Sequence, residues 1–200
     1  MDNSAHENIH PVAEPQLRSG VPRFLFVAII AILGAMYWYA AYGETPAPEK
    51  TVDNFYQAYF DRDFNTVAKN LSVFWSVRFL PEYANLTPAE ILENRAKIEA
   101  DISKVIADIE AENTVPQGVS IEIMKDYTKI GKNSAIVVYK FIEDGQDTGM
   151  ETALLIKEQE HLRIFNMSPI DVETLEQIKA VDINVLDENF ASLLTTGDVQ

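Results

Sequence analysis

A charge-free run from Phe24 to Tyr42 is the feature that most limits how this chain can fold. No charged side chain occurs between Arg23 and Glu44. As a helix, the run would extend about 28 Å, close to the thickness of one hydrocarbon core. Aromatic residues crowd its far end, as they do at a membrane interface: Tyr37, Trp38, Tyr39 and Tyr42. We therefore predict a transmembrane helix with its ends at Phe24 and Tyr42.

Two other interpretations of this run are a cleaved secretory signal peptide and a buried helix of a soluble protein. A signal peptide has an apolar stretch of about 7–15 residues that ends in small side chains, whereas this run is longer and ends in aromatic ones. A buried helix would normally carry a polar stripe. Arg18 and Arg23 precede the run and Glu44 follows it, so the positive-inside rule predicts a cytoplasmic N-terminus. The expected location is the cell membrane, in single-pass form, with the C-terminal domain extracytoplasmic.

The composition limits the function classes that remain. The formal net charge of -15 argues against nucleic acid as a partner. The absence of cysteine removes disulfides, thiol catalysis and cysteine metal sites. The segments divide as follows: a cytoplasmic tail (1–23), the transmembrane helix (24–42), a proline-containing linker (43–50), an extracytoplasmic cone-like α+β domain (51–170) and an acidic C-terminal tail (171–200).

The α+β domain is expected to begin with helices. An apolar stripe at helical spacing predicts the first one: Val52, Phe55, Tyr56, Tyr59 and Phe60. Asp63 is expected to cap a second helix. The segment Thr87-Pro88-Ala89-Glu90 is a capping box that opens a long third helix, ending near Glu112.

After Gly118 the apolar period changes to two, which is typical of strands. Four strands are predicted, at 119–124, 135–143, 150–157 and 162–167. Their short connections imply an antiparallel meander whose one face the preceding helices cover. Beyond Asp171 the tail has a second amphipathic pattern. Docking on the sheet, binding to a partner and fraying are all compatible with that pattern, and docking is our preferred interpretation.

The order of these elements resembles the nuclear transport factor 2-like superfamily. The segment from Phe55 to Phe64, an aromatic stripe that ends at an acidic turn, is similar to that family's opening helix. Leu154-Leu155-Ile156-Lys157-Glu158, followed by Leu162-Arg163-Ile164, is similar to its terminal hairpin, although no tryptophan precedes the basic residue. The resemblance implies a three-helix plus four-stranded curved sheet. It also implies that enzymes of this type would use a carboxylate base and a hydrogen-bond donor inside the cone.

No catalytic set, cofactor site or metal site is predicted from the residues. Asp61, Asp63 and Asn65 start a calcium-loop pattern, but the glycine and glutamate that this pattern requires are missing. His161 is expected to be solvated beside a hairpin turn. The candidate pocket-lining residues are aromatic: Tyr56, Tyr59, Trp75 and Tyr139.

The expected function is that of a membrane-anchored binding or scaffold domain rather than an enzyme. Its expected partners are the lipid bilayer through the anchor, a protein or a second copy of the chain, and a small apolar ligand. The topology resembles that of the inner-membrane scaffold subunits of type IV secretion systems. The alternative is a membrane-tethered isomerase- or hydratase-like enzyme with a carboxylate in the cone pocket, and signal cleavage would instead give a secreted domain. An acidic side chain facing a deep pocket would favour the enzyme, whereas a filled cone would favour the scaffold.

Overall fold

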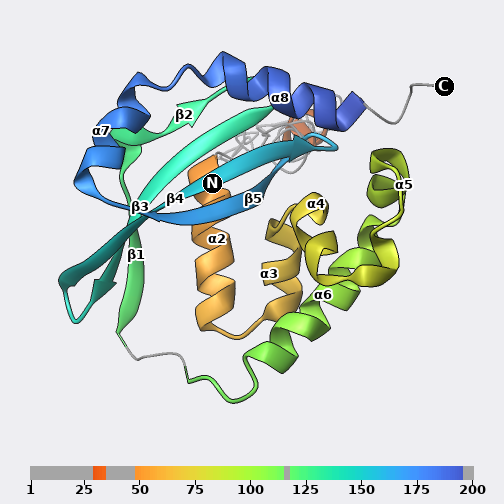
Figure 1. Cartoon of the computed structure of the whole chain (residues 1–200), viewed down its shortest axis with the longest axis horizontal. Helices are drawn as coiled ribbons and strands as arrows, with labels where there is room; N and C mark the ends of the chain where they lie inside the picture. Colours follow the sequence, from red (N-terminus) through yellow and green to blue (C-terminus); the bar gives the residue numbers. More distant parts are fainter. Residues whose placement is uncertain (1–28, 35–47, 115–117, 196–200) are drawn as a thin grey trace, which may run out of the picture. The chain divides into compact units, whose positions relative to one another are not determined.

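The computed structural model describes residues 29–34, 48–114 and 118–195 (Figure 1). The chain divides into two compact units, Met1–Glu44 and Thr45–Gln200. In the first unit, residues 29–34 form a short helix. The expected cytoplasmic tail, 1–23, lies outside the described residues.

The prediction of a transmembrane helix from Phe24 to Tyr42 is wrong. Within this run the structure describes residues 29–34, which are helical. No helix in the described ranges combines the length and the apolar character needed to cross a membrane. Both expected ends, Phe24 and Tyr42, lie outside those ranges. A run without charged residues shows where charge is absent and does not by itself fix the length of a helix.

The second unit begins with a layer of helices. These are α2 (Pro48–Phe60), α3 (Phe64–Asn70), α4 (Val73–Ser76), η1 (Val77–Phe79), η2 (Pro81–Tyr83), α5 (Pro88–Glu93) and α6 (Arg95–Ile109). Two predicted caps are confirmed: Asp63 accepts the Thr66 N–H at 3.1 Å, and Thr87 and Glu90 form a complete capping box. The long third helix is instead divided at Asn94, whose side chain donates to the Glu90 carbonyl at 2.8 Å. Asparagine competes for backbone hydrogen bonds in this way, which makes it a poor residue for a helix interior.

The sheet that follows is antiparallel, so the predicted α+β class is confirmed for this unit. Its strands are β1 (Val119–Ile123), β2 (Lys129–Ile130), β3 (Ser134–Glu143), β4 (Gln146–Glu158) and β5 (His161–Ile170). The order is β1-β3-β4-β5, and β2 pairs with β3 as well. The sequence predicted the four longer strands and missed β2, because two residues are too few to show an alternating pattern.

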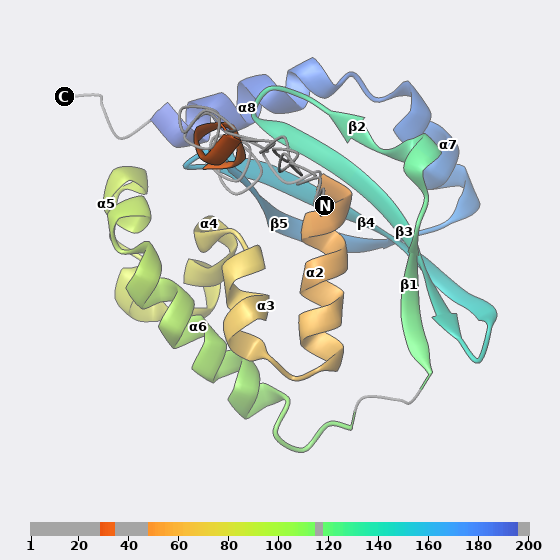
Figure 2. The same ribbon diagram turned by 180° about the vertical axis from the view of Figure 1, so that it is seen from behind.

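The C-terminal segment docks on the sheet. It forms α7 (Val172–Ala180) and α8 (Ile183–Thr195), which lie on the opposite face of the sheet from α2 and α3 (Figures 1 and 2). Asp187 of α8 accepts hydrogen bonds from the backbone N–H groups of Lys132 and Asn133 and from the Ser134 hydroxyl. Lys129 donates to two carbonyls at the end of α7, those of Lys179 and Val181, both at 2.6 Å. Of the three interpretations of this segment, docking is the one that the structure adopts.

Candidate functional site

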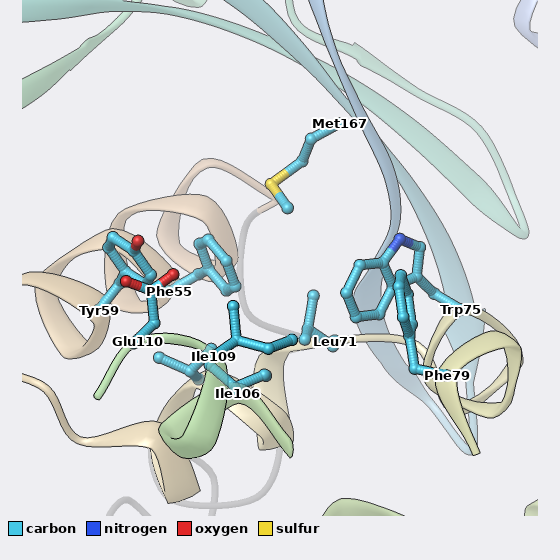
Figure 3. A pocket seen from close by; sticks show the side chains of 10 residues that line it. Phe55, Tyr59, Leu71, Trp75, Phe79, Ile106, Ile109, Glu110 and Met167 are labelled. Atoms are coloured by element: carbon cyan, nitrogen blue, oxygen red, sulfur yellow. The ribbon is translucent and has the colours of Figure 1, made fainter. Parts of the chain in front are cut away.

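An apolar cavity lies between the helical layer and the last strand, and we call it the first pocket (Figure 3). Its volume is about 250 Å³. It is lined from α2, α3, α4, η1, α6 and β5 by Phe55, Tyr59, Val67, Leu71, Trp75, Phe79, Ile106, Ile109, Glu110 and Met167. Figure 3 shows Tyr59 beside Glu110 at one end and Trp75 beside Phe79 at the other, with the Met167 side chain pointing into the space between them.

The turn between α2 and α3 fixes the polar end of this pocket. Arg62 adopts a positive φ of 57°, and its guanidinium donates to the carbonyls of Glu110 at 2.6 Å and Asn113 at 2.8 Å. A cation at these carbonyls also complements the dipole of α6. The contact holds the end of α6 against α2 and places Glu110 near Tyr59. Burial, followed by hydrogen bonding to Glu110, raises the pKa of the Tyr59 hydroxyl.

A buried ion pair fixes the opposite end of the pocket. Glu158, at the end of β4, is 1% exposed. Its carboxylate accepts from the Ser72 hydroxyl and pairs with Arg95, the first residue of α6. Ser72 is in turn the N-cap of α4 and accepts the Phe74 N–H at 3.1 Å. Since α4 carries Trp75, Glu158 helps to fix the position of Trp75 in the lining of the first pocket.

A second pocket of about 370 Å³ adjoins the first on the other side of the α2 aromatic stripe. It is lined by Phe55, Tyr56, Tyr59, Phe60, Phe141, Glu151 and Met167. Phe55, Tyr59 and Met167 line both pockets, so these three side chains form the wall between them.

A hydrogen-bonded cluster of two tyrosines and one carboxylate lies at this second pocket. Tyr139 and Glu151 are directly opposite in the β3–β4 ladder, so their side chains share one face of the sheet. The Tyr139 hydroxyl donates to Glu151 Oε2 at 2.7 Å, and the Tyr56 hydroxyl lies 2.9 Å from that of Tyr139 and 3.2 Å from the same carboxylate oxygen. Burial is the main cause that raises the pKa of both tyrosines, and the charge of Glu151 raises it further.

The residues expected to line a pocket are divided by the structure. Trp75 lines the first pocket, Tyr59 lines both, and Tyr56 lines the second. Tyr139 is fully buried and is not part of the lining of either pocket. Its hydroxyl group contacts Tyr56 and Glu151, which line the second pocket. His161 is exposed at the start of β5, away from both pockets.

Sequence reasoning missed Glu151, although the pattern of its strand contained a signal. Glu151, Ala153 and Leu155 alternate along β4, and the latter two lie in the buried core against α2. A charged residue at an inward-facing position of a strand is unusual and indicates a site or a buried network.

No metal site forms from the acidic segment after α2. Asp63 is taken up by its cap, and Asn65 accepts from the Ser103 hydroxyl at 3.0 Å. Within the described ranges, no group of three or more His, Cys, Asp or Glu side chains is placed to hold a metal ion.

Comparison with family models, curated proteins and solved structures gives no match to this chain. The resemblance to the nuclear transport factor 2-like superfamily therefore stays a prediction. The chemistry of the two pockets is what remains to indicate a function.

Proposed function

We propose that this domain is a binding module for a small, largely apolar ligand, which it holds in the first pocket. The observation that carries the proposal is the lining, in which Glu110 is the single charged residue among aromatic and aliphatic side chains. Ligand sites are typically concave and apolar, with a few polar groups that set orientation. The volume of about 250 Å³ is just below the range of about 300–1,000 Å³ for drug-sized ligands. It suits a molecule of one or two rings or a short aliphatic chain.

The mouth of the first pocket supports ligand entry. Ile109 is 61% exposed and Phe79 is 48% exposed, and both belong to the lining. Large apolar side chains that stay exposed beside a cavity favour a site that an apolar molecule covers. Tyr59 and Glu110 at the polar end would then orient a ligand that carries one hydrogen-bonding group.

A fluorescence titration tests this proposal. The full chain with Trp38→Phe retains Trp75 as its single tryptophan. Titration with the neutral, apolar probe N-phenyl-1-naphthylamine is expected to raise probe emission and to quench Trp75, with one saturable site. Ile106→Phe adds volume inside the pocket and should weaken binding on the order of tenfold, which corresponds to about 1.4 kcal/mol.

The matched control is Ile130→Phe, the same substitution at a position that is 60% exposed on β2 and outside both pockets. Its affinity for the probe should remain within about twofold of the parent. If the parent shows no saturable uptake, or if the two variants weaken binding equally, the first pocket is not the binding site.

A second candidate function is proton transfer by Glu151, and it is favoured by the position of this carboxylate at the second pocket. The carboxylate could take a proton from a carbon acid such as a cyclic ketone. The hydrogen bonds argue against it, because the Tyr139 proton is directed to the carboxylate and the Tyr56 proton to Tyr139 or the same carboxylate, and not to a substrate oxygen. Exchange of ketone α-protons in deuterated water, measured by NMR, tests it. The enzyme hypothesis requires exchange by the parent protein and its loss in Glu151→Gln.

A further inference from the structure

We infer that the second pocket binds an organic ammonium ion, such as a trimethylammonium head group. The inference goes beyond the proposed apolar ligand, because it concerns a different cavity and a charged ligand. It depends on three features of the second pocket: its aromatic walls, the unpaired carboxylate of Glu151, and the direction of the hydroxyl protons beside it.

Aromatic rings surround the second pocket at several different angles. The rings of Tyr56 and Phe141 are 5.3 Å apart between centroids and nearly perpendicular, at 87°. Phe60 lies 5.8 Å from Tyr56 and 6.1 Å from Tyr59, with interplanar angles of 37° and 68°. Rings in such different orientations cannot all stack on one flat ligand. A round cation can instead contact several of these rings at their negative faces, which is how aromatic cages hold quaternary ammonium ions.

Glu151 supplies a carboxylate whose protein contacts are hydrogen bonds from hydroxyl groups. Among the residues that the structure describes, Glu151 takes part in no ion pair. Lys140, the residue after Tyr139 on β3, forms its ion pair with Asp147. Arg62, near Tyr59, is engaged by the carbonyls at the end of α6. A ligand that carries a positive charge would therefore complete the ion pair that Glu151 lacks.

The hydroxyl groups beside Glu151 turn their oxygen atoms, and not their protons, to a ligand. Tyr139 uses its proton for Glu151, and the acceptors nearest to the Tyr56 proton are Tyr139 and the same carboxylate. Both protons thus remain within the cluster, and oxygen lone pairs are what the cluster offers to a ligand. Such a cluster attracts a cation and disfavours an anion.

The same lining discriminates among cations. Calcium takes about six to eight oxygen ligands, and one carboxylate with two hydroxyl groups supplies few of them. An unsubstituted ammonium would need hydrogen bonds on every N–H, whereas the pocket is walled mostly by rings. An alkylated ammonium carries its charge on an apolar surface, and so it gains from both the rings and the carboxylate.

Calorimetric titration of the full chain with choline tests the inference. The matched ligand is 3,3-dimethyl-1-butanol, which has the shape of choline without its charge. Choline is expected to bind at least tenfold more tightly than this neutral alcohol. Glu151→Gln keeps the size and the acceptor oxygen but removes the charge, so it should reduce the preference to within about twofold. Phe60→Leu removes one ring face and should weaken choline about threefold.

The control is Glu122→Gln, which removes one negative charge from β1, two strands away from Glu151, opposite Lys140 in the ladder and outside the pocket. It should leave choline affinity within about twofold of the parent, and thermal melts should show that all variants are folded. Equal affinity for choline and the neutral alcohol would overturn the inference. An equal loss in Glu122→Gln and Glu151→Gln would overturn it too, because it would indicate attraction by the net charge alone. Neither result depends on whether the first pocket takes up its apolar probe.

Discussion

Glu158→Gln should destabilise the domain more than any surface change of the same kind. The Glu158 side chain is fully buried, and it links the N-cap of α4 to Arg95 at the start of α6. Glutamine retains one acceptor for Ser72, but it presents an N–H group or a neutral oxygen to the guanidinium. The substitution thus leaves a largely buried cation without its main partner, which is the costly way to break an ion pair.

The expected size follows from the surroundings of Arg95. Removal of one member of a buried pair typically costs 3–5 kcal/mol. Arg95 retains Glu99 at 3.2 Å, and its own side chain is 14% exposed, so the lower end of this range, about 3 kcal/mol, applies. Arg163 adds to the cost. Burial and then the charge of Arg95 lower the pKa of its guanidinium, and the charge of Glu158 opposes this effect. Glu158→Gln removes that opposing charge. For a domain of this size, 3 kcal/mol corresponds to a decrease in Tm of about 6–12 °C.

Urea unfolding followed by circular dichroism measures this loss. Glu160→Gln is the matched control, because it removes the same charge from the same hairpin but from an exposed ion pair with Lys157, in which the Glu160 side chain is 83% exposed. Its Tm should remain close to that of the parent. The emission of Trp75 should shift to longer wavelength only in Glu158→Gln, since α4 loses its anchor. A loss of unfolding free energy below about 1 kcal/mol for Glu158→Gln would refute the reasoning, because a buried charge that loses its partner should cost more than this.

Three further predictions concern a close contact, a turn and a buried hydroxyl. Gly131→Ala would bring a Cβ within 2.5 Å of the Asp187 carboxylate. It should lower the free energy of unfolding in urea by about 1–3 kcal/mol and speed hydrogen exchange in α8. Gly149→Ala, which has open space around it, should do neither. Glu160→Gly should raise Tm by about 2–4 °C, because residue 160 has φ of 68° and glycine adopts this conformation without strain; a lower Tm would contradict this. Burial raises the pKa of Tyr139 above its ordinary 10.0, so the unfolded state releases this proton first and stability should fall above pH 10 by about 1.4 kcal/mol per pH unit. Tyr139→Phe should reduce that alkaline slope by the share of one proton, because Tyr56, whose pKa burial also raises, keeps its own contribution; an unchanged slope would contradict the assignment.

The helices were predictable where the signal was local. The capping box at Thr87 and the N-cap at Asp63 both involve side chains within three residues of the groups that they satisfy, and both are confirmed. The break at Asn94 was missed because the apolar pattern continues through it, and periodicity does not register a side chain that bonds to its own backbone. The transmembrane prediction, in contrast, relied on composition alone, and no helix in the described ranges has the length and apolar character to cross a membrane.

The strands and the candidate site were predictable in part. Alternation along β4 placed the strand, but the sequence does not show that a bulge interrupts the pairing of β4 with β5 after Leu154. Because of that bulge, Ile164 and Met167 both lie on the α2 face, although three positions separate them. A strict period of two would put them on opposite faces. Met167 therefore reaches both pockets for a reason that no pattern in the sequence records.

The aromatic stripe of α2 contributes side chains to both pockets. The sequence predicted a single buried stripe, yet Phe55 and Tyr56 are buried whereas Tyr59 and Phe60 are only partly so. Residues that served the core alone would be buried along the whole helix. The last turn of α2 instead presents Tyr59 to both pockets and Phe60 to the second. A ligand in either pocket therefore contacts the same helical turn, so Tyr59→Leu should weaken both the apolar probe and choline. Leu71, in contrast, lines the first pocket and not the second, and Phe141 lines the second and not the first. Substitution of Leu71 should therefore weaken the apolar probe alone, and substitution of Phe141 should weaken choline alone.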